Sequence, residues 1–542
     1  MAKVKQPLEE NGIHRAKMWE IMMYALNNTS TNTYMMVVGY ISYFLIGIVG
    51  LASVLAGSIV TIMRIWDGVT DPFVGMAVDK TNGKFGKNRP FIVLGQIIMF
   101  ITTYFMFNFI PNMSMSIRFP VFIVIYMIYI VGYTCQCVVT KSAQTCLTND
   151  PKQRPIFAMC DSVYNIILMS ILIPVIVTDN LVPKYTLTAE ANAAEIAAIV
   201  AKNPNLAGIV EKSGGNLSAF YNPALFQNMQ LLFGGLSAVF AVCAIIALWR
   251  KDNSKYFGLG TQQKIGIKDY ADTLAHNRAI QMLVVSASTD KLFMSTMSNS
   301  TVMICLFGIV FGNYAAYSSY SQITSIPIAL ISILLMNKIA RQLGQKASMM
   351  AGTWGGIIGS ITIALFLVFA NPKGDATKFA MPAFRIIKPE TWGTLFTGWS
   401  ATALIFILLV IVWRGVQQLS SSIVITMTAD CADYEVYRTG KYVPGLMGTL
   451  FSFVDKLISS LATTLVAVFY SFVGFKDALP DTLTPYSDGI FWATVGCFVL
   501  LPIVGWLCNV VAMKFYPLTK EKMEEIQAEI GRIKAEAAAK QA

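Results

Sequence analysis

Charged residues are scarce in this chain. Only 13% of its 542 residues are Asp, Glu, Lys or Arg, whereas a water-exposed domain carries about a quarter. Histidine is nearly lacking, with only His14 and His276, and neither a nucleophile elbow nor a phosphate-binding loop occurs. We therefore do not expect an enzyme.

Three other signals are missing. The first 18 residues are polar and lack an apolar core ahead of a cleavage site, so we expect no signal peptide. The nine cysteines lie mostly in apolar segments, in a pattern that fits neither a zinc site nor a disulfide framework. The net charge of +11 comes from basic residues in short loops, which indicates membrane topology and no nucleic-acid partner.

Apolar runs fill most of the length instead. Hydrophobic residues make up 55% of the chain, and one bilayer crossing needs about 20 of them in a row. We predict an all-α membrane protein with twelve transmembrane helices in two six-helix halves. The expected spans are 17–46, 50–79, 91–112, 119–147, 155–179, 226–249, 278–311, 317–339, 348–370, 396–428, 446–473 and 486–515.

The distribution of Lys and Arg predicts the orientation. Most basic loops fall on one side, which places both termini in the cytoplasm, although the loop between spans 9 and 10 departs from the rule. An Ala/Glu-rich stretch at 187–202 predicts an added outer helix, which is either a lid or inert. The expected organisation is an N-terminal half (1–249) with an extra outer loop (180–225), a central cytoplasmic loop (250–277), a C-terminal half (278–517) and a polar helical tail (518–542).

An ionisable residue at the bilayer centre costs about 2.5–3.5 kcal/mol on insertion scales, so such residues are informative. Asp67 and Asp71 are four residues apart and share one helix face. The two charges repel unless a cation lies between them or one is protonated. Pro72 also frees the carbonyl of Gly68 from its helical bond. The pair is either a coupling-cation site, with Na⁺ as a possible metal, or a structural pair neutralised by Arg64 or a lysine.

Lys456 lies inside an apolar span and needs a carboxylate partner. The Asp67/Asp71 pair is one candidate from another helix. A local arrangement with Asp455 in a water-filled cavity is the alternative.

Other polar residues within the spans have two interpretations each. Lys141 and Asp161 lie on consecutive helices and could form a structural ion pair. The amide and hydroxyl run 27–32 suits either hydrogen bonding to a polyol ligand or contacts between helices. For Asp290 and Lys291 an interfacial pair is at least as plausible as a functional one.

Three motifs together are specific. The pattern Arg-x-Trp-Asp-x-x-x-Asp-Pro-x-x-Gly-x-x-x-Asp, followed by Gly-Lys-x-Arg-Pro, spans 64–90. Ala-Asp-Cys-Ala-Asp-Tyr-Glu at 429–435 precedes Lys456, and Asn-Asp-Pro-Lys-Gln-Arg occupies 149–154. This arrangement resembles the glycoside–pentoside–hexuronide:cation symporters, the melibiose permease relatives of the major facilitator superfamily, along roughly 19–517.

The resemblance implies a mechanism. Asp67 and Asp71 would be the cation ligands, Thr134 would join the cation site, and Lys456 would be a coupling lysine close to it. The family works by alternating access, in which the cation offsets the repulsion of the carboxylates and raises sugar affinity. The coupling ion would be Na⁺ or H⁺, with no other cofactor.

The sugar pocket departs from the family. Galactoside-binding members use acidic residues on helices 1 and 4, where this chain has Asn28 or Asn32 and Cys137. Asp161 occupies the position of the family's helix 5 arginine, while Lys141 is gained. Lys141 either favours an acidic sugar or neutralises Asp161. The substrate-binding candidates are therefore Asn28, Asn32, Tyr133, Cys137, Lys141 and Asp161.

We therefore expect a plasma-membrane symporter that imports a sugar or glycoside, with a hexuronide or pentoside as possible substrates. Its partners would be the sugar, a monovalent cation and the bilayer. The alternatives are a symporter of a non-sugar amphiphile and a non-transporting sensor with the same fold.

Overall fold

The structure is a computed structural model that describes residues 15–532 apart from 82, 149–152, 254–274, 383–388, 395–396, 440–443, 527 and 530–531. The chain divides into two compact units, Met1–Thr261 and Gln262–Ala542, and this division falls within the predicted central loop. α-Helices make up nearly all the regular structure of the described residues, which confirms the all-α fold.

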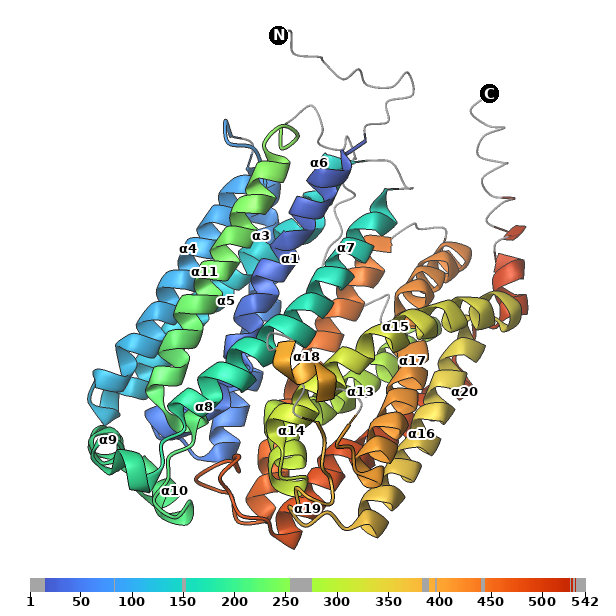
Figure 1. Ribbon diagram of the computed structural model, residues 1–542. Helices are drawn as coiled ribbons and strands as arrows, with labels where there is room; N and C mark the ends of the chain where they lie inside the picture. The colour runs from blue at the N-terminus through green and yellow to red at the C-terminus, as the bar shows by residue number, and fades with distance from the viewer. Residues whose placement is uncertain are drawn as a thin grey trace. The chain divides into compact units, whose positions relative to one another are not determined.

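The long helices of the N-terminal unit pack in a continuous bundle (Figure 1). α1 packs against α7 and α11, α4 packs against α5 and α11, and α3 packs against α5. Their bounds are α1 Met18–Val38, α3 Ser53–Lys80, α4 Arg89–Asn108, α5 Met115–Ser142, α7 Arg154–Ile167 and α11 Pro223–Leu248. Shorter pieces are α2 Ile41–Phe44, α6 Gln144–Leu147, α8 Val182–Tyr185, and the π-helical turns η1 Leu45–Val49, η3 Leu168–Leu172 and η4 Pro174–Leu181.

The C-terminal unit is a second bundle. α13 packs against α17, α18 and α20, while α17 also packs against α15 and α16. The bounds are α13 Arg278–Met297, α14 Ser300–Ile304, η7 Cys305–Val310, α15 Tyr314–Leu343, α16 Gln345–Ala370, α17 Ala401–Thr439, α18 Pro444–Phe472, α19 Asp488–Val495, η9 Gly496–Leu500 and α20 Leu501–Phe515.

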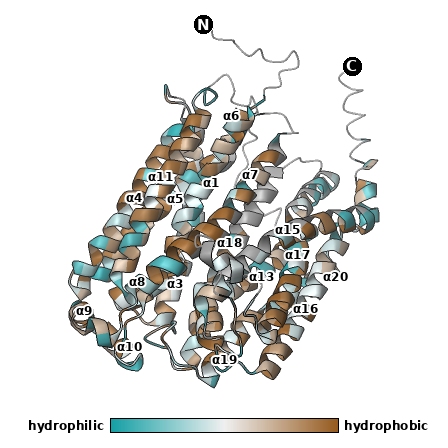
Figure 2. Cartoon of the chain, in the orientation of Figure 1, coloured by the Kyte–Doolittle hydropathy of each residue, from teal (hydrophilic) through white to brown (hydrophobic). Residues whose placement is uncertain are grey.

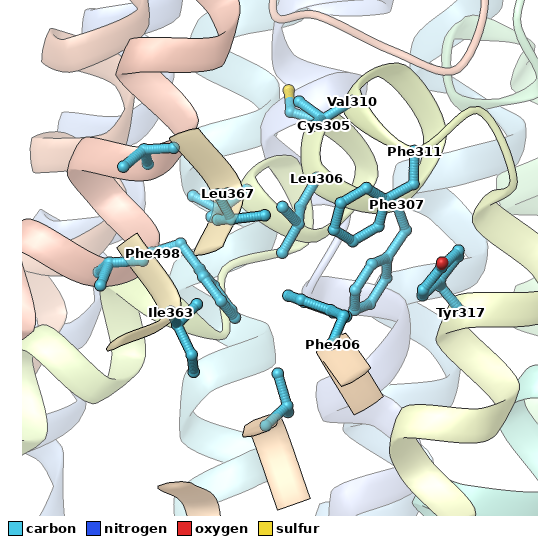
Figure 3. Packing of buried hydrophobic residues seen from close by; sticks show 14 of the residues in the cluster. Cys305, Leu306, Phe307, Val310, Phe311, Tyr317, Ile363, Leu367, Phe406 and Phe498 are labelled. Atoms are coloured by element: carbon cyan, nitrogen blue, oxygen red, sulfur yellow. The ribbon is translucent and has the colours of Figure 1, made fainter. Parts of the chain in front are cut away.

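Aromatic packing fills part of this second bundle. Phe311 stacks on Phe379 with ring centroids 4.6 Å apart, and Phe406 meets Phe311 edge to face at 4.7 Å. Figure 3 shows Phe307 and Phe311, from η7 and its C-terminal end, close to Tyr317 of α15 and Phe406 of α17. Such offset and edge-to-face contacts add to the burial of apolar surface, so they hold α14–η7, α15 and α17 together.

Each of the twelve predicted spans coincides with a helix or a broken helix of the structure. Seven helices of the described residues are long and apolar enough to cross a bilayer, or eight if α13 and α14–η7, bent by 43°, form one span. Figure 2 shows hydrophobic colour along most of these helices. The crossing of the remaining spans stays a prediction.

The predicted outer helix at 187–202 is present as α9 (Ala189–Lys202), which precedes a short α10 (Ala207–Lys212). Arg118 fixes this segment to the bundle. Its guanidinium, 2% exposed, donates to Asn203 Oδ1 at 2.6 Å and Lys202 O at 3.0 Å. It also donates to the carbonyls of Ile48, Pro111 and Met113 at 2.5, 2.9 and 3.0 Å. The outer segment is therefore clamped to the helix ends beneath it.

The polar tail predicted at 518–542 is not wholly solvated. Leu518 and Ile526 are buried in a cluster with residues of α13, α15 and α17. Glu525 accepts from Tyr437 at 3.1 Å, and Lys520 donates to the carbonyl of Gln342 at 3.2 Å. Two apolar side chains in a charged segment are enough to dock its first turns, because burial of each contributes about 1.5–3 kcal/mol.

Candidate functional site

α3 carries the first acidic residue of the signature into the interior of the N-terminal bundle. Asp67 is 1% exposed, and Thr134 of α5 donates to its Oδ1 at 3.1 Å. Thr70 extends the cluster, with its Oγ1 2.9 Å from Thr134 Oγ1 and 2.9 Å from the Asp67 carbonyl oxygen. The structure therefore joins Asp67 and Thr134, two residues that the resemblance placed at one site.

Asp71 lies one helical turn further on and is half-buried. Pro72 sits inside α3, so the Gly68 carbonyl lacks its usual helical donor. This stretch therefore gathers carboxylate, hydroxyl and carbonyl oxygens, the ligand chemistry that hard cations prefer. The chemistry of these donors fits Na⁺, and protonation of one carboxylate would relieve the same repulsion.

Arg64 contacts the same cluster. Its Nη1 lies 3.8 Å from Asp67 Oδ2, and its guanidinium lies 5.9 Å from the centroid of the Tyr133 ring. The neutralisation of Asp67 by Arg64, which the sequence left open, is thus seen. The contact is longer than the roughly 2.7–2.9 Å of a strong charge-assisted hydrogen bond. A cation could therefore compete with Arg64 for this carboxylate.

A second polar cluster joins α1 to α7. Asn28 Nδ2 donates to both carboxylate oxygens of Asp161, at 2.8 and 3.0 Å. Asn32 Nδ2 donates to Asn165 Oδ1 at 2.6 Å, and Asn165 in turn donates to Asp161 Oδ1 at 3.1 Å. All four side chains are half-buried. Three of the proposed sugar-binding residues therefore form one amide–carboxylate surface, which Asn165 completes.

The other face of the polar run on α1 makes contacts between helices. Ser30 bonds to Ser237 of α11, with the two Oγ atoms 2.7 Å apart. Thr31 donates to Gln136 Oε1 at 3.1 Å, and Gln96 of α4 accepts from Ser237 and Gln136, both at 3.1 Å. The run 27–32 therefore makes contacts between helices on both faces, and its binding of a polyol ligand stays a prediction.

The remaining candidate residues are Cys137, Lys141, Asp455 and Lys456. Cys137 is half-buried one turn after Tyr133 on α5. The side chains of Lys141 and Asp455 lie outside the described residues, so the ion pairs considered for them stay predictions. Lys456 is half-buried on α18 of the C-terminal unit, and its approach to Asp67 and Asp71 stays a prediction too.

Asp290 and Lys291 do not form the interfacial pair that the sequence had suggested. Asp290 is 4% exposed and accepts from Trp506 Nε1 at 2.7 Å and Ser420 Oγ at 3.2 Å, while Lys291 is exposed. Consecutive residues of a helix point about 100° apart, so the two side chains cannot share one environment.

The Gly-Lys-x-Arg-Pro half of the signature has a structural role. Asp252, 1% exposed and just past α11, accepts from the backbone N–H groups of Lys87, Asn88 and Arg89 at 3.1, 2.9 and 2.9 Å. A carboxylate here complements the positive end of the α4 dipole. Gly86 is required because it has φ +89° and a Cβ would lie 2.2 Å from Asp252 Oδ2. Nothing local in the sequence marks Asp252 as the partner.

Lys251 supports the same corner of the N-terminal unit. It pairs with Glu20 at 3.7 Å and donates to the Leu147 carbonyl at 2.9 Å. Burial lowers the pKa of this lysine, and the carboxylate of Glu20 opposes the shift. The first residues of the predicted central loop are therefore anchors of the bundle.

The sequence reasoning missed one charge. Arg414 lies on α17 within the apolar stretch Ala401–Ser420. Asp67 and Lys456 were singled out because a charged residue inside an apolar span is costly. The same reasoning applies to Arg414, so the sequence alone could have identified it.

Comparisons with known proteins identify the family of the chain. The profile of the family described as MFS/sugar transport protein matches residues 24–520. The isoprimeverose transporter of Lactiplantibacillus pentosus is 20% identical over 505 residues, covering 92% of this chain and 89% of the relative. The glucuronide carrier protein homolog of Escherichia coli (strain K12) is 20% identical over 514 residues and 94% of both chains.

Among solved structures, the nucleoside transporter NupG is similar in fold, with a TM-score of 0.56 and 10% identity over 93% of this chain and 100% of that one. The likeness concerns the fold alone. The match to the family profile over nearly the whole chain confirms the family that the motifs indicated, and the protein belongs to the MFS/sugar transport family of membrane transporters.

Proposed function

We propose that this transporter imports a sugar or glycoside coupled to Na⁺ or H⁺, by alternating access. The observation that carries the proposal is the buried Asp67 carboxylate, bonded to Thr134 and followed one turn later by Asp71. Placing carboxylates within a membrane costs free energy, and such residues are typical of ion pathways. A helical bundle could fold without this pair, so the pair indicates a function.

The polar surface formed by Asn28, Asn32, Asp161 and Asn165 supports a hydroxylated substrate. Its amides can donate to and accept from sugar hydroxyls, and the Asp161 carboxylate can accept from them. The full-length relatives named as carriers of isoprimeverose and a glucuronide are consistent with this chemistry. An amphiphile would require a more apolar lining than these residues provide.

Replacement of the acidic pair tests the proposal. In proteoliposomes, Asp67→Cys or Asp71→Cys should abolish gradient-driven accumulation of glycoside while leaving exchange without a gradient less affected. A matched control is Asp375→Asn, which removes an acid that lies outside the helices of the C-terminal unit. Undiminished Na⁺- or H⁺-dependent uptake by both Cys variants would refute the cation site.

The sugar surface needs its own test. Asn28→Leu and Asn32→Leu should weaken glycoside binding, because each removes an amide donor. The first takes a hydrogen-bond partner from Asp161 and the second takes one from Asn165. Unchanged affinity in both variants would place the substrate elsewhere.

A further inference from the structure

The charge on α17 has no place in the mechanism described so far. Arg414 lies within Ala401–Ser420, a helix segment long and apolar enough to cross the bilayer. An arginine at such depth costs about 2.5–3.5 kcal/mol on insertion scales, and residues of this kind face the interior of a bundle or a water-filled path.

The burial pattern of α17 shows which way Arg414 points. Ile407, Val410 and Gln417 are buried at 4%, 5% and 1% exposure. They lie seven and four residues before Arg414 and three after it, so all share one helical face. The lipid-facing side is the opposite one, with exposed Leu404, Ile405, Leu408 and Val412. Arg414 is itself half-buried, so its side chain belongs to the inner face.

Two nitrogen donors on this inner face lack acceptors. Arg414 Nε is buried with no hydrogen-bond partner, and the same is true of the Gln417 Nε2 amide. Arg414 forms no ion pair with a carboxylate anywhere in the described part of the chain. A buried donor without an acceptor costs about 1–3 kcal/mol, so a ligand acceptor that reached both groups would be stabilised here.

The nearby acid does not supply it. Asp290 approaches α17 through Ser420, but its two oxygens accept from Trp506 and Ser420. Ser420 also donates to the backbone carbonyl of Gln417. The carboxylate of Asp290 is thus bonded to neutral donors, and no carboxylate among the described residues balances the guanidinium charge.

We propose that Arg414 and Gln417 form an anion subsite in the C-terminal unit that binds the carboxylate of an acidic sugar. This inference rests on the proposed function and specifies its substrate class. A guanidinium presents paired N–H donors that match the two oxygens of a carboxylate, and the Gln417 amide adds a neutral donor one turn away. Hydroxyl groups would satisfy the donors but leave the positive charge unmatched in an apolar segment.

The test compares methyl glucuronide with methyl glucoside, which differ only at C6, where the first has a carboxylate and the second a hydroxymethyl group. In proteoliposomes and in thermal-shift measurements on the purified protein, the wild type should prefer the glucuronide. Arg414→Gln should weaken glucuronide binding about tenfold or more, the loss expected for one charge-assisted pair, with little change for the glucoside. Arg414→Lys should bind the glucuronide with an affinity between those of the wild type and Arg414→Gln, because lysine keeps the positive charge but lacks the paired N–H donors. Gln417→Leu should give a smaller, glucuronide-selective loss.

Arg278→Gln is the matched control, because it removes an arginine at the start of α13, outside the apolar part of the bundle, and should leave both affinities unchanged. Equal losses for both sugars in Arg414→Gln would show a structural role and overturn the subsite. A wild type that carries and is stabilised by the glucoside alone would also overturn it while leaving the proposed function intact. Failure of every glycoside to accumulate would refute the proposed function itself.

Discussion

Substitution of Thr134 by valine tests the cation site with little change in shape. Thr134 is fully buried and donates to Asp67 Oδ1 at 3.1 Å. Valine keeps the volume but deletes one oxygen from the set that would surround the cation. The loss should resemble that of a hydrogen bond to a charged group, about 1.5–3 kcal/mol. The cation concentration for half-maximal uptake should therefore rise about 10- to 150-fold.

The assay is initial glycoside uptake into proteoliposomes over a series of Na⁺ concentrations and, separately, of external pH. Thr103→Val is the matched control, since Thr103 is buried in the same unit and its hydroxyl bonds only to carbonyls of its own helix, at 2.7 and 3.2 Å. It should leave cation dependence unchanged. If Thr134→Val transports with the same half-maximal Na⁺ concentration and pH dependence as the wild type, Thr134 is no part of the cation site.

Three further predictions concern the scaffold. Arg118→Ala removes the five hydrogen bonds that clamp the outer segment, so limited proteolysis should cut at 187–216 while the bundle persists; full resistance would contradict the clamp. Asp290→Asn keeps an acceptor for the buried Trp506 N–H, whereas Asp290→Leu leaves it unsatisfied at a cost of about 1–3 kcal/mol, so only the leucine variant should melt earlier. Asp252→Ala should also lower the melting temperature, because three backbone N–H groups at the start of α4 lose their acceptor; an unchanged melt would show that water replaces it.

The helices and their order were predictable because each span carries its own apolar run. The outer helix at 187–202 was predictable for a similar local reason. How helices rotate against each other depends on tertiary packing. The contact between Asp67 and Thr134 therefore came from a resemblance and not from the residues themselves.

The polar run on α1 shows the same limit. Helical periodicity separates Asn28 and Asn32 from Ser30 and Thr31, so a division between two faces could have been anticipated. Which face would meet Asp161 depends on the neighbours, and no pattern within the run specifies them. The role of Asp252 could not be predicted for another reason, because a single acidic residue after a helix does not indicate which loop it binds.

The central claim is that a cation gradient drives sugar uptake. Wild-type protein in vesicles should accumulate labelled methyl glycoside above the external concentration when an inward Na⁺ or H⁺ gradient is imposed. Accumulation should collapse when an ionophore dissipates that gradient. Uptake that only equilibrates, at the same rate with and without either gradient, would contradict the account.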